Sequence, residues 1–130
     1  MRVYIAAALQ DAQLALQVAT TLPKHGHAPV SSWYAGPKPA AQDSSLTAAE
    51  SLELSQKIRR EIRDADALLL LYRRECHGAM WEVGWAFGMG KPVYVVGDQK
   101  TASPPLRHEG ALFFDTVDAF VTAMTVRQLG

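Results

Sequence analysis

The stretch ADALLLLYRRECHGAMWEVGWAFGMGKPVYVV, residues 65–96, decides the fold of this chain. Asp66 introduces a continuous apolar run, which is typical of a central strand covered by helices on both faces. A helical segment over 78–89 follows and closes at Gly90, and 92–96 reads as another buried strand. A strand, a helix and a second strand in this order predict two parallel strands joined by a helical crossover.

The rest of the chain repeats this alternation. The remaining segments are strands over 2–7, 28–33 and 111–114, and helices over 11–24, 47–63 and 115–128. Asp11 is expected to cap the first helix, and Thr47 and Glu50 form a capping box at the start of the second. One domain over residues 1–130 is therefore predicted: a three-layer α/β open sandwich with a five-stranded, mainly parallel sheet of the flavodoxin or Rossmann kind.

Composition narrows the classes of partner. The 13 basic residues balance the 13 acidic ones, so the chain lacks the electrostatic signature of a nucleic-acid or membrane-surface protein. Cys76 is the one cysteine, which excludes an intrachain disulfide and a cysteine-based metal site and fits a cytoplasmic location. The apolar start of the chain is too short for a membrane span and reads as a strand, not a signal peptide. A small molecule is the expected partner.

The predicted fold also indicates where a ligand binds. Open α/β sheets bind ligands beyond the carboxyl ends of their strands, so the loops over 6–10, 33–45 and 72–78 form the expected site. The segment 34–45 is rich in Gly, Pro, Ala and Ser, and we interpret it as a lid. Glu82 faces this edge as one acid among small and aromatic residues. It is either a helix-start carboxylate or a working group.

These residues resemble a known family. The strand VYIAA, the run ADALLLLY and the pattern G-x-x-x-E-x-G-x-A followed by GKPVYVV are similar to the nucleoside 2-deoxyribosyltransferase superfamily, which includes 2'-deoxynucleoside 5'-phosphate N-hydrolases. The resemblance implies cleavage or transfer at the N-glycosidic bond of a (deoxy)nucleoside or nucleotide. It makes Glu82 the nucleophile and implies no metal or redox cofactor.

The same resemblance implies roles for other residues. Tyr4 would hydrogen-bond and orient the carboxylate, and Ala6 and Ala7 would let the sugar lie close. Gly78 would open the floor of the pocket, and Trp33 would stack on a base. Family members commonly assemble through their helices, so a homodimer or higher homo-oligomer is expected.

Two departures from the family pattern open an alternative. Family enzymes carry an aspartate eight residues before Asp66, where this chain has Ile58; Glu61 is one helical turn away. Where transferases place an acid before the glycine, this chain has Cys76 and His77. The alternative is a nucleotide-binding module with little or no turnover. A more distant one is an NAD-cleaving enzyme of the Toll/interleukin-receptor type.

Several neighbours of the site have two readings each. His77 either protonates a leaving base or contacts a phosphate, or it is a polar cap residue. Arg73 and Arg74 either bind a 5'-phosphate, or they are solvated or paired with Glu75. The Trp81/Trp85 pair, four residues apart, is expected to form a core or subunit contact.

Overall fold

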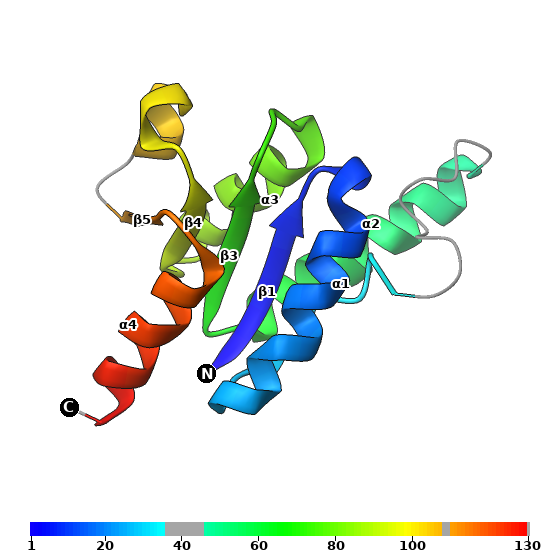
Figure 1. Cartoon of the computed structure of the whole chain (residues 1–130). Helices are drawn as coiled ribbons and strands as arrows, with labels where there is room; N and C mark the ends of the chain where they lie inside the picture. The colour runs from blue at the N-terminus through cyan, green and yellow to red at the C-terminus, as the bar shows by residue number, and fades with distance from the viewer. Residues whose placement is uncertain (36–45, 108–109, 130) are drawn as a thin grey trace.

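Five parallel strands form one sheet in the computed structural model, which describes residues 1–35, 46–107 and 110–129 (Figure 1). The strand order is β2-β1-β3-β4-β5. The strands are β1 (Arg2–Ala7), β2 (Ala28–Pro29), β3 (Ala67–Tyr72), β4 (Val93–Gly97) and β5 (Ala111–Phe114). The open α/β sandwich is confirmed, and every strand pair is parallel.

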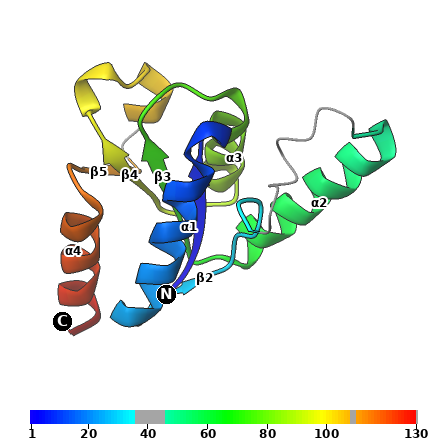
Figure 2. The ribbon, with the colours of Figure 1, turned by 45° about the vertical axis from the view of Figure 1, so that its right-hand side comes forward.

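The helices cover both faces of this sheet. They are α1 (Ala12–Thr21), α2 (Ala48–Asp64), α3 (His77–Gly88) and α4 (Val117–Leu129). The two views show α1 and α4 on one face of the sheet and α2 and α3 on the other (Figures 1 and 2). Strand order reverses between β1 and β3, because the chain moves from β1 outward to β2 and then returns to the other side of β1. This reversal makes the carboxyl ends of β1 and β3 the expected ligand edge.

The central strand explains the stability of the arrangement. Every residue of β3 is buried, and its register sets Tyr4 beside Leu68 and Ala6 beside Leu70.

The capping box at the start of α2 is confirmed, with both the Thr47 and the Glu50 side chains engaged. At the far end of α2, Lys91 Nζ donates to the carbonyl oxygens of Arg63 and Ala65 at 2.9 and 2.8 Å. The lysine of the G-K-P segment therefore caps a helix at the edge opposite the expected ligand site.

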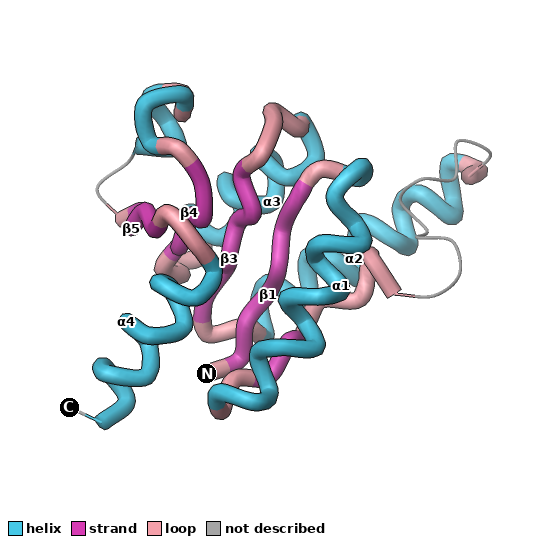
Figure 3. Tube along the Cα trace, viewed as in Figure 1, coloured by secondary structure: helices cyan, strands magenta, loops and turns pink. Residues whose placement is uncertain are grey.

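Two sequence-based expectations need correction. The second strand ends at Pro29 instead of continuing to residue 33 (Figure 3). Beyond it, side chains replace the ladder: the Ile5 amide donates to Ser31 Oγ at 3.0 Å, and Trp33 Nε1 donates to the Ile5 carbonyl at 2.7 Å. Asp11 occupies the N-cap position of α1 but makes no capping hydrogen bond, because its carboxylate is turned toward two arginines.

Two further features bear on function. No helix within residues 1–35, 46–107 and 110–129 is long and apolar enough to cross a membrane. Most of the segment interpreted as a lid, residues 36–45, lies outside the described residues.

Candidate active site

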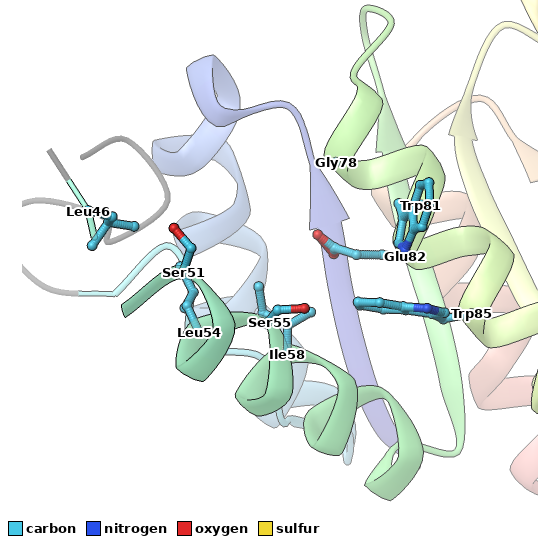
Figure 4. A pocket seen from close by; sticks show the side chains of 9 residues that line it. All are labelled: Leu46, Ser51, Leu54, Ser55, Ile58, Gly78, Trp81, Glu82 and Trp85. Atoms are coloured by element: carbon cyan, nitrogen blue, oxygen red, sulfur yellow. The ribbon is translucent and has the colours of Figure 1, made fainter. Parts of the chain in front are cut away.

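The site centres on a contact between β1 and α3. Tyr4 Oη donates a 2.7 Å hydrogen bond to Glu82 Oε2. Tyr4 is fully buried in the middle of β1, and Glu82 lies in the second turn of α3. Glu82 is half-buried and points toward the space between α3 and α2 (Figure 4). The structure thus contains the tyrosine–carboxylate contact that the family resemblance implied, while the roles of the two residues stay predictions.

Burial controls the charge of this pair. It raises the pKa of Glu82 from its ordinary 4.5 to about 7; the Tyr4 hydrogen bond lowers that pKa, and the charge of Glu61 raises it. The pKa of Tyr4 is raised well above its ordinary value, first by burial and then by the nearby Glu82 charge. Tyr4 therefore stays a neutral donor, while Glu82 changes between acid and carboxylate near neutral pH. Such a carboxyl group suits acid–base or nucleophilic chemistry.

Two cavities meet at Glu82. The outer cavity, of about 300 Å³, lies between α2 and α3 (Figure 4). The inner cavity, of about 240 Å³, lies at the end of β1. Ile58, Gly78 and Glu82 line both. The other described residues of the outer cavity are Leu46, Ser51, Leu54, Ser55, Trp81 and Trp85, and those of the inner cavity are Ala7, Leu9, Trp33, Cys76 and Ala79. The carboxylate is therefore open to a ligand on two sides.

The structure brings together most of the residues predicted for the site. Ala7 and Trp33 form walls of the inner cavity. A Cβ added to Gly78 would meet nothing within 4 Å, so this glycine leaves open space beside Glu82. Ala6 is fully buried and does not line either cavity. His77 is exposed at the start of α3 and borders a separate groove with Trp81 and Trp85.

The arginines after β3 pair with Asp11 instead of Glu75, and binding of a 5'-phosphate by these arginines stays a prediction. Arg74 Nε lies 3.3 Å from Asp11 Oδ2, and Arg73 Nη1 lies 3.8 Å from Asp11 Oδ1. Asp11 is almost completely buried, whereas both arginines are about half exposed. Their acidic partner is thus Asp11 and not the neighbouring Glu75. The pairs join the loop after β1 to the loop after β3.

Two other expectations have different outcomes. Asp66 accepts the Arg2 backbone N–H at 2.7 Å, which supports its structural reading at the start of β3. Trp81 is 69% exposed, so it is not a core residue. Its ring lies edge-to-face with Trp85, with centroids 6.5 Å apart, and the Arg59 guanidinium lies over Trp85. A subunit contact through Trp81 stays a prediction.

Sequence reasoning missed three serines. Ser51 and Ser55 lie one turn apart on α2 and line the outer cavity. Their signal in the sequence was their i, i+4 spacing beside the apolar stripe of that helix, which consists of Leu54, Ile58 and Ile62. Ser32 was hidden because it was predicted to lie in a strand; its hydroxyl donates to Glu61 Oε2 at 2.6 Å.

No group of three or more His, Cys, Asp or Glu within the described part of the chain could hold a metal ion. Glu82 and Cys76 are the ionisable residues among the described residues that line the two cavities, and Tyr4 contacts Glu82.

Comparisons with known proteins agree with this fold. The family described as nucleoside 2-deoxyribosyltransferase matches residues 3–124. The solved structure of the Clostridium botulinum CMP N-glycosidase BcmB is similar over 97% of this chain and 99% of that chain, with a TM-score of 0.63 and 15% sequence identity. At that identity the likeness shows a shared fold. A comparison with curated protein sequences finds no match.

Proposed function

The chain belongs to the nucleoside 2-deoxyribosyltransferase family, and we propose that it cleaves or transfers at the N-glycosidic bond of a (deoxy)nucleoside or nucleotide through Glu82. The observation that carries the proposal is the partly buried Tyr4–Glu82 hydrogen bond at the meeting point of two cavities. Those cavities lie at the edge where the strand order reverses, which is where this class of fold binds ligands. The family and the N-glycosidase neighbour support chemistry at N-glycosidic bonds in general.

The proposed reaction follows the logic of a retaining glycosidase. Tyr4 holds Oε2 of the carboxylate, so Oε1 is the oxygen that attacks the anomeric carbon. An electron pair of Oε1 forms the new C–O bond while the C–N bond breaks and its pair leaves with the base. The resulting glycosyl ester is then resolved by water or by a second base. The ionised form of Glu82 is the nucleophile, so the first step requires a pH near or above 7.

The leaving base must also gain a proton, and the site offers little help. Ile58 occupies the position of the family's helix aspartate and presents an apolar side chain to both cavities. Glu82 is the one carboxylate among the described residues that line them. We therefore propose that the base takes its proton from water.

The test is release of free base. The protein is incubated with a panel of deoxynucleosides, ribonucleosides, their 5'-monophosphates and NAD, and each free base is measured by chromatography. We expect release from at least one nucleoside or nucleotide, loss of release in Glu82→Ala, and normal release in Glu53→Gln, which changes an exposed acid that lines neither cavity. Undiminished release by Glu82→Ala would refute the nucleophile. Release of nicotinamide alone would favour the NAD-cleaving alternative.

Ile58 also favours a second candidate function, a binding module for a nucleoside or nucleotide. An apolar residue in place of an acid removes a catalytic group but leaves the cavities intact. Calorimetry with the same panel separates the two functions. Tight binding without base release over hours supports the binding module, whereas absence of any binding eliminates it.

A further inference from the structure

A second carboxylate lies behind the cavity wall. Glu61 follows Ile58 by one turn of α2, and Ser32 Oγ donates to its Oε2 at 2.6 Å. Its other oxygen, Oε1, is buried and has no hydrogen-bond partner among the described residues. A buried carboxylate oxygen without a donor costs stability, so its retention calls for an explanation.

The surroundings of Glu61 supply one. Helix α2 packs against both β1, which carries Tyr4, and α3, which carries Glu82. The negative charge of Glu61 acts on both of these groups and raises the pKa of each. Glu61 nevertheless lines neither cavity, whereas Ile58 lines both. Glu61 is therefore placed to influence the reacting carboxylate but not to contact a ligand.

We propose that Glu61 is a positioning residue of this site: held by Ser32, its carboxylate acts as a second negative charge on Glu82 without touching the substrate. This inference rests on the proposed function for its catalytic meaning. When Glu82 Oε1 bonds to the anomeric carbon, the C–N electron pair departs with the base and Glu82 loses its negative charge. The repulsion between the two carboxylates is then relieved. In the transition state of that step, both negative charges stabilise the positive charge that develops on the sugar.

The groups around Glu82 come from several elements. Tyr4 reaches it from β1, and Glu61 acts on it from α2. Cys76, just before α3, lines the inner cavity with it, and Arg59 of α2 lies over Trp85 beside the outer cavity. Tyr34, after β2, is held by Ser31 and also senses the Glu61 charge. Of these groups, Tyr4 and Glu61 are the two that shift the pKa of Glu82.

The test is a titration that needs no substrate. The side-chain carboxyl carbons of 13C-labelled glutamates are followed by NMR from pH 4 to 9 in the wild type, Glu61→Gln and Glu53→Gln. Glutamine keeps an oxygen for the Ser32 hydroxyl and removes the charge. We expect the Glu82 titration to move to lower pH by roughly half a unit to one unit in Glu61→Gln, because loss of a like charge favours the ionised form. Glu53, an exposed acid on the same helix, should leave it unchanged.

Activity supplies a second readout. If base release is detected, the acidic limb of the kcat/KM profile should move by the same amount as the NMR titration. A Glu82 titration that stays in place or moves upward in folded Glu61→Gln overturns the proposal. If that variant does not fold, the wild type decides: two interacting carboxyl groups titrate together, so the Glu82 curve should depart from a single-site titration, and a single-site curve overturns the proposal. Because the titration uses free protein, lack of base release would refute the proposed function alone.

Discussion

Replacing Glu82 with glutamine should stabilise the fold, and increasingly so as pH rises. In the folded protein the pKa of Glu82 is raised from 4.5 to about 7, chiefly by burial. Between these two values the folded state therefore binds more protons than the unfolded state, so this group lowers stability as pH increases across that window. At about 1.4 kcal/mol for each pH unit, ionised Glu82 costs the fold roughly 3 kcal/mol at pH 8.

Glutamine avoids this cost. It is neutral at every pH, has nearly the same shape, and keeps an oxygen that can accept the Tyr4 hydroxyl. The difference in free energy of unfolding between Glu82→Gln and the wild type should be about 1 kcal/mol at pH 5 and about 3 kcal/mol at pH 8. For a chain of this size that corresponds to a rise in Tm on the order of 10 °C. The same variant should lose base release, as expected of a group that trades stability for function.

Urea unfolding of both proteins at pH 5, 6, 7 and 8, followed by circular dichroism, measures this difference. Glu53→Gln provides the matched control, because it removes an exposed carboxylate and should behave like the wild type throughout. A Glu82→Gln protein that is no more stable at pH 8, or whose advantage does not change with pH, would refute the reasoning. In that case burial would not be holding the carboxyl group near its neutral form.

Three further predictions concern the hydrogen bond, the leaving group and the helix cap. Tyr4→Phe removes the donor that favours ionised Glu82, so the acidic limb of the kcat/KM profile should move up by about one pH unit. Base release should therefore fall about fivefold at pH 7 and less than that at pH 9. An acidic limb that does not move would contradict the role of the hydrogen bond. Because Ile58 supplies no proton, N7-alkylated purine nucleosides, whose base departs without one, should release base faster than their parent nucleosides; equal rates would point to an acid that the site does provide. Lys91→Met should lower the free energy of unfolding by about 1 kcal/mol, because it removes two hydrogen bonds at the end of α2. Lys57→Met changes an exposed lysine on the same helix and should leave the free energy of unfolding unchanged. Urea titration of both variants measures the difference.

The local parts of the fold could be predicted because each has a local cause. The apolar run of β3 indicates a strand covered on both faces, and the Thr47–Glu50 spacing closes a capping box within four residues. Alternation of strands and helices then leaves a parallel sheet as the expected architecture. The extent of β2 could not be predicted, because Ser31 and Trp33 replace its ladder with side-chain bonds to Ile5.

The sequence by itself determined the strands, the helices and the edge of the sheet at which Glu82 stands, since periodicity and capping act over a few residues. Apart from the Tyr4–Glu82 contact, which the family resemblance implied, the tertiary structure alone decided which groups meet there. Tyr4 reaches Glu82 across 78 residues, Arg74 reaches Asp11 across 63, and Ser32 reaches Glu61 across 29. Such meetings depend on strand register and on how two helices pack over β1, and no local pattern records either. The charge of Glu82 near neutral pH follows from the same burial, because desolvation is a property of the assembled fold.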